Sequence, residues 1–222
     1  MQAFEYAVNL GYRYLETDVH VTADGVVAAF HDDDLRRTTG RAGKISELPW
    51  SEVSKLLVDG KAPIPLLEDL IGAWPDVRIN IDCKTGAAVD ALIAALRRTD
   101  SLGRVCVAAF SDSRLRRLRK GLGDELCTSL GPLESAFLRF GLRRHFTGLA
   151  AQVPVKQGPV TVVTRGFVER AHRAGLHVHV WTIDDDAEMQ RLLDLGVDGI
   201  MTDRPLVLRQ VLQSRNAWHS PT

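Results

Sequence analysis

The chain has 222 residues, of which 45% are hydrophobic, and its 28 lysines and arginines balance 28 aspartates and glutamates. This length and apolar content suffice for one substantial core, so we predict a single domain over residues 1–222. The net charge of zero argues against a nucleic-acid partner, because binding to a phosphate backbone needs an excess of basic side chains.

The sequence also bears on the compartment. No stretch approaches the roughly 18 apolar residues that a membrane span needs, and the chain does not begin with a charged leader followed by an apolar core. Three cysteines, Cys83, Cys106 and Cys127, lie in apolar runs and are odd in number, which favours reduced thiols over a disulfide framework. We therefore expect a cytoplasmic protein that is not stably inserted in a membrane.

The predicted elements begin with an amphipathic helix over Gln2–Leu10, which ends at Gly11, a residue type common just after helices. A strand follows from Tyr14. The pair Asp24-Gly25 then suits the two central positions of a type I′ hairpin turn, because both positions need a positive φ. The run from Tyr14 to Asp34 is thus predicted to form a hairpin.

The predicted hairpin has a defined register. Residues whose numbers add up to 49 oppose each other around this turn, which places Asp18 across from His31. Glu16, Asp18 and His20 alternate with Thr17 and Val19 and therefore share one face. An E-x-D pattern alone is more often the solvated face of a strand. We nevertheless expect two carboxylates and an imidazole to converge here, because the strand otherwise belongs to a buried sheet.

From residue 75 onward, short apolar runs alternate with amphipathic stretches, which is typical of a parallel sheet covered by helices. The runs that predict strands are VRINIDCK, VCVAAF, LCTSL, LAAQVP, HVHVWT and GIMTD. The stretches that predict helices include Ala87–Arg98, Ser113–Lys120, Leu133–Arg143, Thr164–Ala174 and Asp186–Leu195. We predict an α/β fold, a (β/α)8 barrel of the TIM type. With the strand from Tyr14, seven barrel strands are present where closure needs eight, so we expect the first strand to be absent from this chain.

A second group of polar residues ends the run VRINIDCK. Asn80, Asp82 and Lys84 share one face of this strand, so Asp82 and Lys84 would point toward the mouth of the barrel, where such folds build their sites. Trp181 ends another predicted strand. It suits the floor of a small-molecule site, although a buried aromatic side chain needs no such role.

These residue types favour one kind of chemistry. Glu16, Asp18 and Asp82 would form a cluster of oxygen ligands, which favours a hard divalent cation, Mg²⁺ or Ca²⁺. Lys84 would neutralise the oxygens of a phosphate, and His31 would move a proton, because histidine titrates near neutral pH. The residues alone therefore predict a reaction at a phosphoryl group.

The run AFEYAVNLGYRYLETDVHVTADGVVAAFHDDDLRRTTG closely resembles the glycerophosphodiester phosphodiesterase family, which shows E-x-D-V-x-x-T-x-D-G, then H-D, then R-T-T-G. The likeness continues through IPLLEDLI, NIDCK, AAFSD, HVWTIDD and GVDGIMTDRP, and it is weakest from about residue 121 to 160. It implies a phosphodiesterase barrel with a small insertion after the second strand, here about residues 19–61. It also implies metal-dependent hydrolysis of a small-molecule substrate, a glycerophosphodiester, to glycerol 3-phosphate and an alcohol.

The resemblance assigns roles position by position. It makes Glu16 and Asp18 metal ligands, His31 one of two catalytic histidines and Lys84 a phosphate contact. Asp82 stands where the family usually has glutamate, so its carboxylate is one methylene shorter. The family pattern begins with a strand ending in H-R-G and a loop carrying P-E-N-T, which this sequence lacks. We therefore expect a shortened chain without the partner histidine of His31.

Two alternatives remain open. Related barrels with a similar set of carboxylates and histidines act in the manner of phospholipase D on larger phospholipids. A barrel that keeps the cation and phosphate sites without the pair of proton-transfer groups would instead be a non-catalytic binding protein. The first alternative changes the substrate, whereas the second removes the activity.

Overall fold

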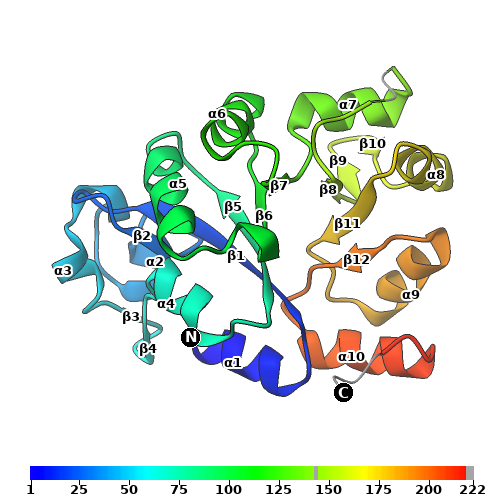
Figure 1. Cartoon of the computed structure of the whole chain (residues 1–222). Coiled ribbons are helices and arrows are strands. Elements are labelled where there is room, and N and C mark those ends of the chain that lie inside the picture. The colour runs from blue at the N-terminus through cyan, green and yellow to red at the C-terminus, as the bar shows by residue number, and fades with distance from the viewer. Residues whose placement is uncertain (143–144, 219–222) are drawn as a thin grey trace. The chain divides into compact units, whose positions relative to one another are not determined.

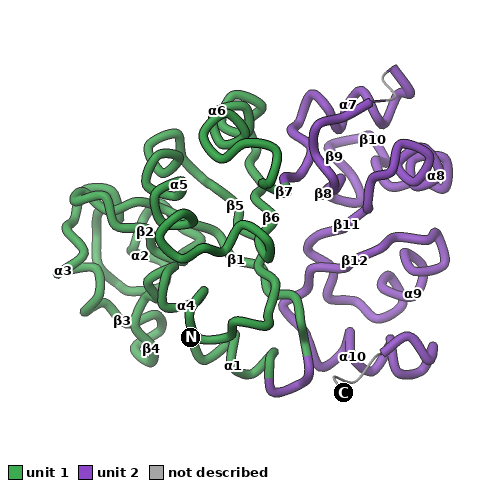
Figure 2. The backbone as a smooth tube through the Cα atoms, in the orientation of Figure 1, with its two compact units in different colours: residues 1–8, 12–127 green, residues 9–11, 128–222 purple. Residues whose placement is uncertain are grey.

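The structure of the protein, a computed structural model, describes residues 1–142 and 145–218 (Figure 1). The chain folds into two compact units, one of residues 1–8 and 12–127 and the other of residues 9–11 and 128–222 (Figure 2). The boundary falls within a short strand, β7 (Cys127–Thr128). Within the described residues, none of the helices combines the length and the apolar sequence that crossing a bilayer requires.

The first unit is built around a five-stranded sheet of order β2-β1-β5-β6-β7. Its strands β1 (Tyr14–Val21), β5 (Arg78–Cys83) and β6 (Val105–Ala108) run parallel to one another, whereas β2 (Val27–Ala29) is antiparallel to β1. The parallel strands follow the order of the chain, as expected where helices connect successive strands.

Helices pack against one face of this sheet. Leu92, Leu118 and Ile81 of β5 are fully buried, and Leu15 of β1 is buried with them in a single core. Burying each such side chain contributes about 2 kcal/mol. Because side chains alternate along a strand, the even-numbered residues of β1 and β5 face away from these helices. The helices of this part are α1 (Gln2–Asn9), α4 (Leu67–Ala73), α5 (Ala88–Arg98), the 3₁₀ turn η2 (Leu102–Arg104) and α6 (Asp112–Leu122).

The segment between β1 and β5 has a small core of its own. Its buried members are Ala28, Phe30, Leu35, Ile45, Val53 and Ile64. Short elements surround this core: α2 (Arg36–Thr39), the 3₁₀ turn η1 (Ile45–Glu47), α3 (Trp50–Val53), β3 (Leu57–Val58) and β4 (Ala62–Pro63). This segment overlaps the expected insertion of residues 19–61, whose extent stays a prediction.

The register of the β1-β2 hairpin differs from the predicted one. Val19 pairs with Ala29, so the numbers of opposing residues add up to 48 rather than 49. The N–H of Phe30 donates to the carbonyl of Asp18 at 2.9 Å. The prediction that Asp18 lies directly across from His31 was therefore wrong by one residue. A register shift of one residue exchanges the two faces of a strand.

The loop of this hairpin explains the difference. Thr22 donates its N–H to Val26 at 2.9 Å, which leaves three residues in the loop instead of two. Gly25 has a φ of 83°, but Asp24 is not among the residues with a positive φ, so a type I′ turn is excluded. Asp24 instead accepts hydrogen bonds from the Thr22 hydroxyl at 2.5 Å and from the N–H of Trp50 at 2.9 Å. Contacts outside the turn thus determine its conformation.

The second unit contains a three-stranded parallel sheet of order β12-β11-β8. Ser129 forms a further parallel bridge to Ala150, the first residue of β8. The strands of the second unit are β8 (Ala150–Pro154), β9 (Lys156–Gln157), β10 (Val160–Thr161), β11 (His177–Trp181) and β12 (Gly199–Ile200). Its helices are α7 (Pro132–Phe140), α8 (Arg165–Arg173), α9 (Asp186–Leu195) and α10 (Pro205–Ser214).

The predicted order of elements is confirmed. The seven predicted strands correspond to β1, β5, β6, β7, β8, β11 and β12, and the six predicted helices correspond to α1, α5, α6, α7, α8 and α9. The helix predicted over Leu133–Arg143 ends at Phe140, and Arg143 lies outside the described residues. The pattern succeeded because strand and helix periodicities are local properties of the sequence.

Candidate active site

The candidate site lies in the first unit, on the face of the sheet opposite the helices. Asp18 of β1 is in register with Asp82 of β5, and Glu16 with Asn80. Residues in register on neighbouring parallel strands project on the same side of a sheet, so the two aspartates are neighbours. Asp18 precedes Val19 and Asp82 follows Ile81, two apolar residues whose burial against the helices holds the strands in this orientation.

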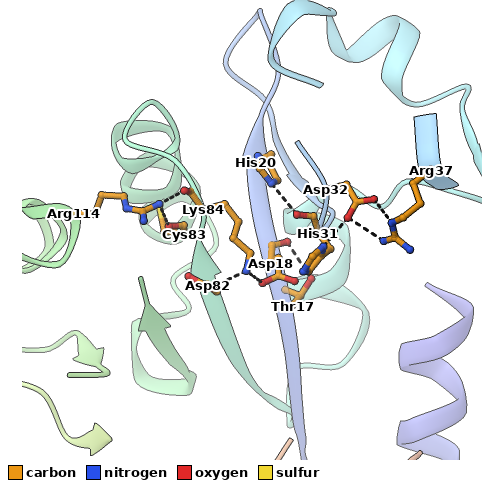
Figure 3. A network of polar contacts seen from close by, with 10 residues as sticks. All are labelled: Thr17, Asp18, His20, His31, Asp32, Arg37, Asp82, Cys83, Lys84 and Arg114. Carbon is orange, nitrogen blue, oxygen red and sulfur yellow. Dashed lines mark hydrogen bonds and ion pairs between the residues drawn. The ribbon is translucent and has the colours of Figure 1, made fainter. Parts of the chain in front are cut away.

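Lys84, just beyond the end of β5, joins the two carboxylates (Figure 3). Its Nζ lies 2.6 Å from Oδ1 of Asp18 and 2.9 Å from Oδ2 of Asp82. The three side chains are largely buried, with exposed fractions of 25% for Lys84, 15% for Asp18 and 8% for Asp82. An ammonium group therefore lies between two carboxylates at the carboxyl ends of adjacent strands.

The protonation of these groups follows from their surroundings. Burial raises the pKa of Asp18, although the hydrogen bond from Lys84 opposes that shift. Burial by itself would lower the pKa of Lys84, but its hydrogen bonds with Asp18 and Asp82 outweigh that effect, and the pKa is raised. Lys84 thus remains a cation at neutral pH.

Asp82 has one oxygen without a partner. Its Oδ1 is buried and makes no hydrogen bond, while Oδ2 contacts Lys84. A buried carboxylate oxygen is costly unless it is paired, so this atom fits the role of a cation ligand. Among the described residues, no three His, Cys, Asp or Glu side chains lie close enough to hold a metal ion as they stand. The full ligand set of Glu16, Asp18 and Asp82 stays a prediction.

His31 lies just after β2, and its side chain is 69% exposed. Its Nδ1 is 2.7 Å from Oδ1 of Asp32, and Arg37 holds the same carboxylate through Nε at 2.6 Å and a terminal nitrogen at 2.9 Å. The hydrogen bonds from Arg37 lower the pKa of Asp32 to about 2. Burial opposes this shift, and the hydrogen bond with His31 adds to it. The ionised Asp32 favours the tautomer with its proton on Nδ1, as carboxylates beside histidines commonly do.

The two groups of side chains lie near each other. His31 contributes to the electrostatic environment of the Asp18 carboxyl, and Figure 3 shows the ring of His31 beside Asp18. His31 therefore comes close to Asp18 although the hairpin register is not the predicted one. The reason is that the backbone bends away from the direction of the strand after β2. His20 supports this bend, since its Nε2 lies 3.1 Å from the carbonyl oxygen of His31.

Two other residues were predicted for the site, Glu16 and Trp181. Glu16 is exposed and shares the face of Asp18, two residues earlier on β1. Trp181 is the last residue of β11 in the second unit and is partly exposed. Its contact with a substrate stays a prediction.

The sequence reasoning missed Asp32, Arg37 and Arg114. Arg114, in the first turn of α6, donates to the carbonyl of Cys83 at 2.8 Å and to that of Lys84, so it holds the end of β5 (Figure 3). A signal existed for Asp32, because it is adjacent to His31 in sequence. No local pattern indicates Arg114, since its partners lie about thirty residues earlier.

Known proteins are similar to this chain in sequence. The sequence model of the glycerophosphoryl diester phosphodiesterase family matches residues 1–127 and 143–207. A probable glycerophosphodiester phosphodiesterase 2 from Mycobacterium tuberculosis is 38% identical over 229 residues, covering 98% of this chain and 86% of that protein. The human lysophospholipase D GDPD1 is 26% identical, over 98% of this chain and 82% of that protein.

A solved structure gives the fold. The chain is similar to a phosphodiesterase from Oleispira antarctica in complex with the product sn-glycerol-3-phosphate, with a TM-score of 0.78 and 19% identity, over 95% of this chain and 90% of that one. The fold class predicted from the sequence, an α/β fold of the (β/α)8 TIM type, is thereby confirmed.

Proposed function

This chain belongs to the glycerophosphoryl diester phosphodiesterase family, whose model covers most of its length, and we propose that it hydrolyses glycerophosphodiesters to glycerol 3-phosphate and an alcohol. The observation that carries this proposal is the group formed by Asp18, Asp82 and Lys84 with His31 beside it. It combines a permanent cation, two carboxylates and a proton-transfer group at the carboxyl ends of two adjacent strands, where TIM-type barrels perform catalysis.

Lys84 binds the phosphodiester in this proposal. Its ammonium group would give up part of its contact with the carboxylates of Asp18 and Asp82. It would then contact the non-bridging oxygens of the phosphate, where negative charge is concentrated. The support is its raised pKa, which keeps it charged, and its position between two neighbouring strands. Trp181 would pack against the glycerol or the alcohol group, as aromatic side chains do in small-molecule sites.

His31 moves the proton. In hydrolysis a water oxygen bonds to phosphorus, the bond from phosphorus to the alcohol oxygen breaks, and a proton must reach the leaving oxygen. With Nδ1 turned to Asp32, the nitrogen of His31 that exchanges this proton is Nε2. Arg37 and Asp32 orient the imidazole without touching the substrate.

A divalent cation, Mg²⁺ or Ca²⁺, completes the proposed site. Asp18 and Asp82 would hold it together with Glu16, and the unpartnered Oδ1 of Asp82 supports that assignment. When bound, the cation would neutralise the charge of the phosphate.

We also infer that the protein acts in the cytoplasm. The support is that Cys83, Cys106 and Cys127 belong to no disulfide in the described structure, as is usual in a reducing compartment. Fractionation of cells that produce the tagged protein checks this inference, and recovery outside the cytoplasm would contradict it.

The test of the proposed function measures glycerol 3-phosphate released from glycerophosphocholine in the presence of Mg²⁺ or Ca²⁺. Replacement of Lys84 by methionine should lower kcat/KM by about a hundredfold or more, since it removes a charge that stabilises the phosphate. Asp90→Asn serves as the control, because Asp90 is an exposed carboxylate on α5 whose ion pair with Arg117 lies outside the site. Circular dichroism verifies that both variants fold.

The outcomes separate the candidate functions. Release of glycerol 3-phosphate that depends on Lys84 supports the proposal, and unchanged release in the Lys84→Met variant refutes the site. Lysophosphatidylcholine is tested in parallel, because one relative is a lysophospholipase D. A preference for that lipid would indicate the larger substrate, and phosphate binding without any turnover would indicate the binding protein.

A further inference from the structure

Two cysteines form a pair that the proposed reaction does not use. Cys106 lies on β6 and Cys127 on β7, which are neighbouring strands in the sheet of the first unit. The thiol of Cys106 donates a hydrogen bond to the sulfur of Cys127. Both residues are partly exposed. Cys106 is in register with Asn80, so it projects from the same face of the sheet as Asp82.

The two thiols differ in acidity. The hydrogen bond from Cys106 lowers the pKa of Cys127 to about 7, although burial opposes this shift. The same hydrogen bond, together with burial, raises the pKa of Cys106 well above its ordinary value. The hydrogen bond therefore favours the thiolate at Cys127 and the protonated thiol at Cys106. The thiolate is the reactive form of cysteine.

The separation of the strands suits a bond between these residues. Neighbouring strands lie about 4.7–4.9 Å apart, and the Cα atoms of disulfide-bonded residues are usually about 4.4–6.8 Å apart. The two thiols lie within hydrogen-bonding reach of each other. A disulfide across β6 and β7 is therefore within reach of these residues.

We propose that Cys106 and Cys127 form an oxidation site that reacts with a hydroperoxide and closes to a disulfide between β6 and β7. In the first step the thiolate of Cys127 attacks the peroxide, the O–O bond breaks, and Cys127 becomes a sulfenic acid while an alcohol or water is released. In the second step the sulfur of Cys106 displaces the sulfenic oxygen, which leaves as water with the thiol proton. The peroxide is reduced by two electrons, and the two thiols are oxidised by two electrons.

The third cysteine provides a comparison within the chain. Cys83 is fully buried in the core under the helices, with an exposed fraction of 0%. Its thiol donates to the carbonyl of Thr85 at 3.5 Å. Cys83 should therefore not react with peroxide while the protein is folded.

The experiment treats the reduced full chain with hydrogen peroxide at pH 7, blocks the remaining thiols under denaturing conditions and maps the peptides by mass spectrometry. The expected product is a peptide pair linked through Cys106 and Cys127 that has lost two hydrogens, with Cys83 recovered as a blocked thiol. Treatment with dithiothreitol should restore both thiols. The variant Cys83→Ala is the matched control and should form the same disulfide.

Single variants test the order of the steps. In Cys106→Ser, no disulfide can form, and a dimedone adduct should accumulate at Cys127. In Cys127→Ser, Cys106 should give at least tenfold less dimedone adduct than Cys127 gives in Cys106→Ser, because Cys106 remains a protonated thiol. Equal oxidation of Cys83, disulfides between separate chains, or an unreactive Cys127 would each overturn the proposal. Circular dichroism of each variant before oxidation excludes loss of folding as the cause.

Discussion

At the level of single residues, Asp32 connects the imidazole of His31 to the guanidinium of Arg37. Arg37 keeps the carboxylate ionised, and the carboxylate in turn restricts His31 to one tautomer and one orientation. Asp32 is thus a positioning residue in the proposed site. Its neighbour Asp33 has a different partner, the side chain of Lys44 at 2.7 Å.

Asp32→Asn should lower kcat by about tenfold to a hundredfold with little effect on KM, as is usual when the partner of a functional histidine is removed. Asn keeps the size of the side chain but can no longer hold the proton of Nδ1 as a carboxylate does. The measurement is steady-state release of glycerol 3-phosphate over a range of pH, in which the profile of the variant should also shift. Asp33→Asn is the matched control. A loss of activity as large in the control would contradict the assigned role.

The same carboxylate affects stability in a defined range of pH. The folded pKa of Asp32 is about 2, below the value of roughly 3.9 for an unfolded aspartate, so the folded state binds this proton less readily. Its stabilising contribution is therefore present above about pH 4 and is lost as the pH falls toward 2. The difference in urea midpoint between the wild type and Asp32→Asn should shrink across this window. A difference that stays constant would show that the ion pair does not contribute.

At the level of elements, the β1-β2 hairpin shows how a side chain outside a turn can determine its conformation. Asp24 is bound to Thr22 and to the first residue of α3, Trp50. These contacts favour a three-residue loop with one glycine at positive φ, and the loop length then determines the register of the strands.

Asp24→Gly tests this explanation. A type I′ turn would accept glycine at that position at no cost, whereas the observed loop loses two hydrogen-bond acceptor contacts and gains backbone freedom in the unfolded state. The melting temperature should therefore fall by a few degrees. Asp24→Asn, which keeps an acceptor oxygen, should lie between the wild type and the glycine variant. An unchanged or raised melting temperature in Asp24→Gly would contradict the role of these contacts.

At the level of the whole molecule, the prediction of a single domain bears on whether the chain unfolds in one cooperative step. The family match extends over residues 1–127 and 143–207, and the boundary between the two compact units falls within β7. We therefore expect one cooperative unfolding transition, as small single domains show.

Two core variants provide the measurement. Leu118→Ala in α6 and Val178→Ala in β11 each remove a fully buried side chain, one in each unit. A Leu→Ala change of this kind costs about 2–5 kcal/mol of unfolding free energy. Hydrogen exchange should show that either variant lowers protection in both units together. Loss of protection confined to the unit that carries the substitution would instead indicate two domains.

The sequence by itself determined the order of strands and helices and the faces on which Asp18, Asp82 and Lys84 lie, because periods of two and of about 3.6 residues are local properties that burial enforces. Which of these side chains contact one another was decided only by the tertiary structure. The contact of Lys84 with Asp18, the support of β5 by Arg114 and the pairing of Cys106 with Cys127 join residues distant in sequence. The register of the hairpin also depended on a distant partner, Trp50, since packing and hydrogen bonds outside a turn can outweigh the preference of its two central residues.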